Sequence, residues 1–180
     1  VWMAGYGSRD HPAEGTLVDL WAKALALEDA NGDKAVLITT DVCYFKENAF
    51  NQICDRLKRE YGLSRSQIIL NASHTHSGPV LRVLEEAPEY YPKSSKESTT
   101  GQFSAEEQEK IRRYKNWLHD QLVELVGEAL NSMEPAKLAS SNGIARFGVN
   151  RRNNIQREAH RGIYQLDGPV DHSVPVLKVT

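Results

Sequence analysis

The sequence lacks any apolar run close to the roughly 18 residues that a membrane-spanning helix needs. Its two cysteines, Cys43 and Cys54, are too few for a disulfide scaffold, and their spacing is unlike that of a zinc ribbon. We therefore expect both to be small core residues. The 22 basic and 24 acidic residues are scattered and leave a net charge of −2. This balance gives no electrostatic footprint for a polyanion, so nucleic acid is not an expected partner.

The composition is typical of one soluble globular domain. Of the 180 residues, 40% are hydrophobic and 26% are charged, which is enough apolar material for a single core. We find no internal repeat and no low-complexity segment. One domain is therefore the expected organisation.

The first half of the chain predicts a hairpin, a helix and a strand. Residues 20–41 place Asn31-Gly32 between two strand-like runs, so we predict an antiparallel hairpin closed by a type I′ turn. Apolar side chains recur at helical spacing over residues 46–61, and Gly62 is placed to end that helix. The apolar residues 68–70 then predict a short buried strand.

The second half predicts a long helix and two further strands. Residues 85–103 contain two prolines and no periodicity, which indicates a long loop or flap. Ser104 and Glu107 form a capping box that opens a helix over 104–131. The runs "AKLASSNGIARFGVN" and "SVPVLKVT" are predicted strands. Together these elements predict an α/β fold, with a mixed β-sheet and flanking α-helices.

The motif that suggests chemistry is "NASHTHSGP", which begins at Asn71 and follows the predicted strand. In extended backbone, residues i and i+2 point to the same side, so His74 and His76 can converge on one small object if strand geometry persists. Imidazole is a common zinc ligand, and the hydroxyls of the neighbouring Ser and Thr residues suit ring orientation or substrate contact. Spacing alone leaves two interpretations open, metal ligands or hydrogen-bonded loop histidines.

Other residues also have a structural as well as a functional interpretation. Asp41 ends a predicted strand and suits either a metal-site carboxylate or the capping of backbone amides. Gly5 and Tyr6 suit either an approach to the site or a tight turn. Tyr90 and Tyr91 suit either an apolar entry for an acyl chain or a solvated loop.

The histidine motif resembles the signature of the neutral, non-lysosomal ceramidase family, whose members carry a Thr-His-Ser-Gly-Pro run at the end of a strand. Four further pieces follow in the family's order and extend the similarity over nearly the whole chain: "GYGS", "TTDV", "FGVNRR" and "VDHSVPVLKV". The chain departs from the family pattern at Val80-Leu81 and at Arg152-Asn153, which leaves the lipid substrate open.

The resemblance implies a zinc amidase, with Zn²⁺ as its cofactor, that cleaves the N-acyl bond of ceramide or a related N-acyl lipid. By this resemblance His74 is the metal ligand, and His76 faces the scissile amide as a hydrogen-bond donor or proton shuttle. Arg151 matches the family arginine that holds the polar end of the substrate, where a fixed cation stabilises a developing oxyanion. The structural alternative for Arg151 is an ion pair with a surface carboxylate.

The family's remaining zinc ligands, a histidine, a glutamate and a tyrosine, lie beyond the strand that "VPVLKVT" resembles. Residues 1–180 are therefore expected to be the N-terminal portion of a larger ceramidase-like catalytic domain, inactive alone because one ligand does not fix a tetrahedral zinc. Two alternatives remain, a dinuclear metallohydrolase that uses both His74 and His76 as ligands, and a non-catalytic binding domain that keeps the fold. The resemblance also implies a secreted, periplasmic or cell-surface location and leaves open a transient contact with a membrane surface.

Overall fold

The computed structural model describes every residue except 7–8, 83–102, 151 and 155–166. The chain divides into two compact units, Val1–Met133 and Glu134–Thr180. That all 180 residues belong to one catalytic domain stays a prediction.

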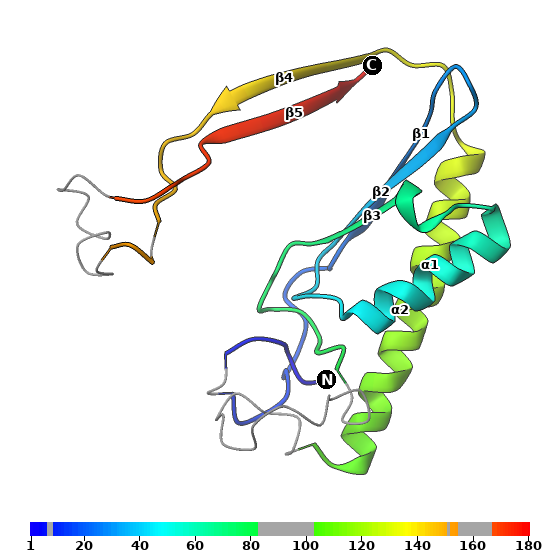
Figure 1. Cartoon of the computed structure of the whole chain (residues 1–180). Coiled ribbons are helices and arrows are strands. Elements are labelled where there is room, and N and C mark those ends of the chain that lie inside the picture. Colours follow the sequence, from blue (N-terminus) through cyan, green and yellow to red (C-terminus); the bar gives the residue numbers. More distant parts are fainter. Residues whose placement is uncertain (7–8, 83–102, 151, 155–166) are drawn as a thin grey trace. The chain divides into compact units, whose positions relative to one another are not determined.

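A three-stranded mixed sheet forms the centre of the first unit (Figure 1). Strand β1 (Ala22–Glu28) pairs antiparallel with β2 (Lys34–Thr40), and β2 pairs parallel with β3 (Ile68–Ala72). The predicted hairpin and the predicted mixed sheet are both confirmed. The parallel pair brings the carboxyl ends of β2 and β3 to the same edge of the sheet, which decides where the candidate site forms.

The hairpin turn differs from the predicted type I′ turn. Gly32 has a positive φ of 86°, whereas Asn31 does not adopt the left-handed conformation that type I′ requires. Asp29 organises the loop instead, because one of its carboxylate oxygens accepts hydrogen bonds from the backbone N–H groups of Asn31 and Asp33, each at 2.9 Å. The N–H of Gly32 donates to the Asp29 carbonyl at 3.0 Å and completes the turn. A side-chain carboxylate thus replaces the tighter turn that the Asn-Gly pair suggested.

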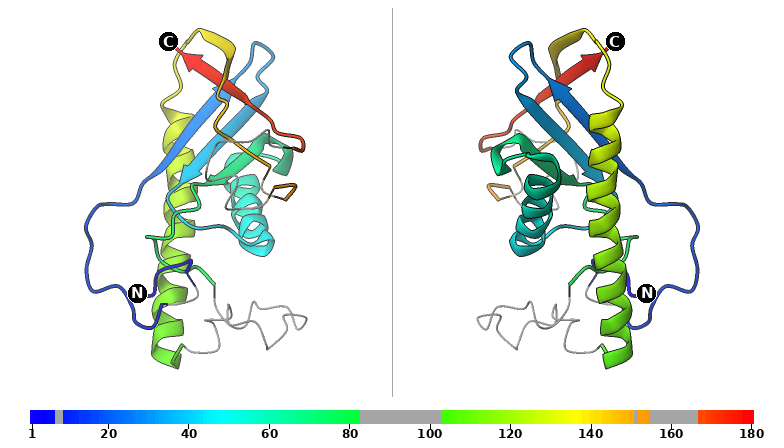
Figure 2. Two further views of the ribbon diagram at one scale, coloured as in Figure 1. Left: turned by 90° about the vertical axis from the view of Figure 1, so that its left-hand side faces the viewer. Right: turned by 90° about the vertical axis from the view of Figure 1, so that its right-hand side faces the viewer.

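The two predicted helices of the first unit are confirmed. Helix α1 (Glu47–Tyr61) ends at Gly62, whose φ of 73° is the left-handed cap expected from the sequence. Helix α2 (Ala105–Asn131) begins with the predicted capping box between Ser104 and Glu107. The short 3₁₀-helix η1 (Arg65–Gln67) leads into β3. Figure 2 shows that both long helices lie on the same side of the sheet.

The core lies between the sheet and these helices. Along β2, the residues Val36, Ile38 and Thr40 are buried, while Leu37 between them is exposed, so one face of the sheet is covered. The predicted buried strand is therefore buried on one face only, since Ile69 on β3 is 62% exposed. The main buried cluster joins all these elements and consists of Val36, Ile38, Val42, Ile53, Cys54, Leu57, Leu63, Ile68, Leu118, Leu122, Val123 and Val126.

The second unit contains the two strands predicted near the end of the chain. Strand β4 (Leu138–Ile144) pairs antiparallel with β5 (Ser173–Val179). Every residue of both strands is exposed. Two strands with both faces exposed make a marginally stable ribbon by themselves.

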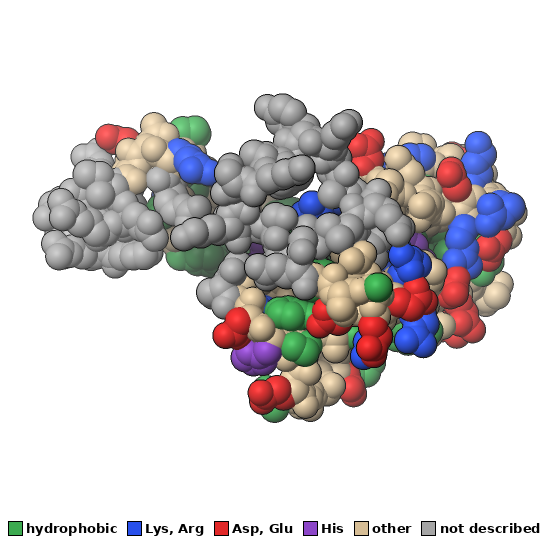
Figure 3. All heavy atoms as spheres, turned by 90° about the horizontal axis from the view of Figure 1, so that it is seen from below, with side chains coloured by type: hydrophobic (Ala, Val, Ile, Leu, Met, Phe, Trp, Pro, Cys, Tyr) green, Lys and Arg blue, Asp and Glu red, His purple; other side chains and the backbone are tan. Residues whose placement is uncertain are grey.

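Charged side chains of both signs are interspersed over the described part of the face shown in Figure 3. This mixture matches the nearly neutral composition of the sequence. None of the described helices combines the length and the hydropathy of a membrane span.

Candidate metal centre

The candidate site lies where β2 and β3 end side by side. The N–H of Ser73, just after β3, donates to the carbonyl of Thr40 at the end of β2, at 2.9 Å. The two chains then separate, one towards Cys43 and the other towards His74. Residues 31 positions apart in the sequence are thereby brought into contact.

His74 is held in a strained and specific conformation. Its φ is 58°, in the left-handed region that non-glycine residues seldom adopt. Its Nδ1 donates a hydrogen bond to the main-chain carbonyl of Cys43 at 2.9 Å. Because a carbonyl oxygen only accepts, the hydrogen resides on Nδ1 and the lone pair of Nε2 is left to bind an electrophile. This is the arrangement that second-shell carbonyls impose on metal-binding histidines.

His76 lies beside His74, as predicted, but for a different reason. The two ring centroids are 5.1 Å apart and the rings are inclined by 59°. Strand β3 ends at Ala72, before either histidine, so the alternation of an extended strand does not align them. The left-handed turn at His74 brings the rings together instead.

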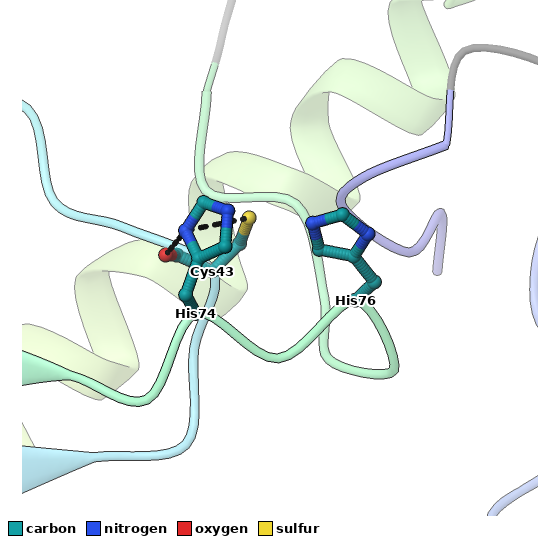
Figure 4. Close-up of side chains that lie close together, drawn as sticks. All are labelled: Cys43, His74 and His76. Atoms are coloured by element: carbon teal, nitrogen blue, oxygen red, sulfur yellow. Dashed lines mark hydrogen bonds between the residues drawn. The ribbon is translucent and has the colours of Figure 1, made fainter. Parts of the chain in front are cut away.

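Cys43 joins the two histidines in a three-donor group. The thiol sulfur and one ring nitrogen of each histidine all lie within 4.8 Å of one another. In Figure 4 the Cys43 Sγ lies between the two imidazole rings, and it is 3.8 Å from the Nδ1 of His74. Cys43 is buried, as the sequence predicts, and burial raises the pKa of its thiol.

Sequence reasoning missed the position of Cys43 next to the histidines. The signal was available in the strand pattern, because "TTDVC" and "NASH" each follow a strand and parallel neighbours end at one sheet edge. The other free cysteine, Cys54, lies in the core on α1 and is not a member of the group.

The N-terminal segment covers the side of the site next to His76. The N–H of Ala4 donates to the carbonyl of Gly78, and the N–H of Val80 donates to the carbonyl of Trp2, both at 2.8 Å. These bonds pair residues 2–4 antiparallel with the chain that leaves the histidine motif. A second buried cluster fixes this arrangement and consists of Trp2, Ala4, Cys43, Val80, Phe103 and Ile111.

Gly5, Tyr6 and Arg9 together hold His76. Gly5 has a φ of 74°, and a Cβ added there would lie 2.3 Å from Cγ of the His76 ring, so no larger residue fits without displacement. The Tyr6 ring meets the His76 ring edge-on, with centroids 4.6 Å apart. Arg9 lies over the Tyr6 ring at 5.3 Å and donates through Nη2 to the His76 carbonyl at 2.6 Å. Of the two interpretations for Gly5 and Tyr6, the structure thus supports an approach to the site.

The remaining candidates lie apart from the three-donor group. Asp41 accepts a hydrogen bond from the backbone N–H of Trp21 at 3.1 Å, which supports its structural role as a cap of backbone amides. The Thr75 hydroxyl accepts from the N–H of Ser77 at 3.2 Å and shapes the loop. Arg151, Tyr90 and Tyr91 fall outside the described residues.

The donor set suits a divalent transition metal. Two imidazole nitrogens and a sulfur are ligands that Zn²⁺ binds readily, whereas Mg²⁺ and Ca²⁺ prefer oxygen. The hydrogen bond from His74 to Cys43 already orients one ring for this purpose. The residues present therefore fit the zinc that the sequence resemblance implies.

Comparisons with known proteins bear on this site. Residues 1–180 match the family model described as neutral/alkaline non-lysosomal ceramidase, N-terminal. Neutral ceramidase of Pseudomonas aeruginosa is 33% identical over 82 residues, which are 44% of this chain and 12% of that protein. Neutral ceramidase 2 of Arabidopsis thaliana is 30% identical over 81 residues, 44% of this chain and 11% of that protein. The matched region is thus a small part of each relative.

Solved structures show the same fold. The crystal structure of the Pseudomonas aeruginosa neutral ceramidase matches with a TM-score of 0.68 and 22% identity, over 99% of this chain and 26% of that chain. A ceramidase complexed with C2 matches with the same values. The mixed α/β fold is thus that of part of a larger ceramidase chain. With the family model matched over its whole length, the chain belongs to the neutral/alkaline non-lysosomal ceramidase family and corresponds to the N-terminal region of that family.

Proposed function

We propose that this chain is part of a zinc-dependent hydrolase that cleaves the N-acyl amide bond of ceramide or a related N-acyl lipid. The observation that supports this most directly is the hydrogen bond from His74 Nδ1 to the Cys43 carbonyl, which leaves Nε2 available to a metal ion next to His76. Membership of the ceramidase family supplies the reaction class.

Each residue has a distinct part in this proposal. The Nε2 of His74 would hold the zinc ion, which when bound polarises a carbonyl and activates water at neutral pH. His76, fixed by Gly5, Tyr6 and Arg9, would donate a hydrogen bond to the amide and move a proton at its ring nitrogen. Arg151 keeps the role that the resemblance gives it, a cation near the developing oxyanion.

The experiment that tests the proposal uses the complete protein that contains this portion. Hydrolysis of an N-acyl sphingosine should stop when a chelator removes the metal and return when Zn²⁺ is added back. Turnover that continues in the metal-free protein would contradict the zinc mechanism. The 180-residue chain by itself should bind lipid amide without turnover, because the family's other zinc ligands lie outside it.

A dinuclear metallohydrolase is the second candidate, and the proximity of three donor atoms within 4.8 Å is the observation that favours it. In such enzymes two metal ions lie about 3.5–4 Å apart and share ligands. Metal analysis separates the two candidates, because one zinc per complete protein supports the mononuclear site and two support the dinuclear one.

A further inference from the structure

Cys43 has a position that the proposed function does not explain. Its sulfur lies between the imidazoles of His74 and His76 (Figure 4), and the three donor atoms are within 4.8 Å of one another. The thiol is buried in the cluster that holds Trp2 and Ile111 near the site. Among the described residues no other group of three His, Cys, Asp or Glu side chains comes this close together.

The spacing is close to that of a tetrahedral metal site. With metal–sulfur bonds of about 2.3 Å and metal–nitrogen bonds of about 2.0–2.1 Å, neighbouring donors lie roughly 3.5 Å apart. The donors here are separated by 4.8 Å or less, and Cys43 Sγ is 3.8 Å from a nitrogen of the His74 ring. A closure on the order of 1 Å would bring them to bonding distance, which small rotations of side chains supply.

The backbone and the side chain of Cys43 serve the same ion in this arrangement. The carbonyl of Cys43 fixes the tautomer of His74 and so directs Nε2 towards a metal. We propose that the Cys43 thiolate is a second ligand to the divalent ion held by His74, so that the site selects thiophilic metals such as Zn²⁺ and Cd²⁺. Metal binding displaces the thiol proton to solvent, and His76 keeps its substrate-facing role. This inference rests on the proposed role of His74.

Cobalt substitution tests the inference on this chain without any assay of activity. Co²⁺ bound in a thiol-free buffer should show ligand-field bands together with a thiolate-to-cobalt charge-transfer band in the near ultraviolet. Cys43→Ser should abolish the charge-transfer band and weaken binding. The matched control is Cys54→Ser, which removes the other buried cysteine and should leave the band unchanged. X-ray absorption of the zinc-loaded wild-type chain should show a sulfur shell at about 2.3 Å, a result that does not depend on the folding of any variant.

The outcomes separate this inference from the proposed function. A cobalt spectrum without the charge-transfer band, a band that survives in Cys43→Ser, or a zinc shell of nitrogen and oxygen alone would each overturn the role of Cys43. None of these results would affect His74 as a ligand. The His74→Ala variant addresses that role by itself, because loss of metal on this substitution supports the proposed function whether or not sulfur is bound.

Discussion

Gly5 lies against the ring of His76 so closely that a Cβ added to it would be 2.3 Å from Cγ of the imidazole. Residues 71 positions apart are in contact because residues 2–4 pair with the chain that leaves the histidine motif. The absence of a side chain at Gly5 is therefore a structural requirement of the position that His76 occupies.

Replacing Gly5 by alanine should displace His76 and reduce catalysis. The added methyl group collides with the ring, and the φ of 74° costs a non-glycine residue about 1–2 kcal/mol. A catalytic group moved by about 1 Å can lose about 100-fold in rate. We expect a loss of kcat/KM on this scale in the complete protein, and altered imidazole resonances of His76 in NMR spectra of this chain. Gly15→Ala is the control, because nothing lies within 4 Å of its added Cβ.

The two histidines should have separable effects. His74→Ala should remove zinc from the complete protein and abolish turnover, because the ring supplies the proposed metal-binding Nε2. His76→Ala should retain zinc and lose about 10²–10⁴-fold in kcat, the usual contribution of a general acid or base. Zinc content and kcat measured on the same samples decide the point. His11→Ala should change neither, since His11 is exposed and bonded to Asp10. Loss of zinc on His76→Ala would favour the dinuclear alternative.

Local sequence patterns predicted most of the fold. The capping box at Ser104, the glycine cap at Gly62 and the alternation along β2 are properties of short segments, and each is confirmed. The hairpin turn was wrong in type because the carboxylate of Asp29 bonds two backbone N–H groups, a contact that the Asn-Gly rule does not consider.

The site could be predicted only in part, because its contacts are between distant segments. The sequence placed His74 and His76 near each other, but their meeting depends on a left-handed residue rather than on an extended strand. The position of Cys43 depends on the parallel pairing of β2 with β3, which no local pattern encodes. Arg151 stays a prediction, because it falls outside the described residues.

The hairpin turn should weaken in acid. Hydrogen bonds from the backbone N–H groups of Asp33 and Asn31 hold the pKa of Asp29 below its usual value of 3.8. Because the pKa is lower in the folded state, the ionised carboxylate stabilises the turn above the unfolded pKa, and this contribution is lost as the pH falls through the folded pKa. Amide exchange of Asn31 and Asp33 should therefore accelerate in this acidic range relative to the intrinsic rate. Asp29→Ala should show fast exchange of both amides at all pH values, and a pH-independent protection in the wild type would contradict the assignment.

Two equal truncations in the two buried clusters should differ in their effect on the site. Ile53, fully buried in the main cluster, and Ile111, 1% exposed in the cluster with Trp2 and Cys43, have nearly the same burial. Each Ile→Val change should lower the free energy of unfolding by about 0.5–1.5 kcal/mol, as measured by urea denaturation. The cavity left at Ile111 adjoins the packing that holds Cys43 and the N-terminal segment, so only Ile111→Val should also weaken Co²⁺ binding by this chain. Equal metal affinities in the two variants, at equal loss of stability, would show that the second cluster does not position the metal ligands.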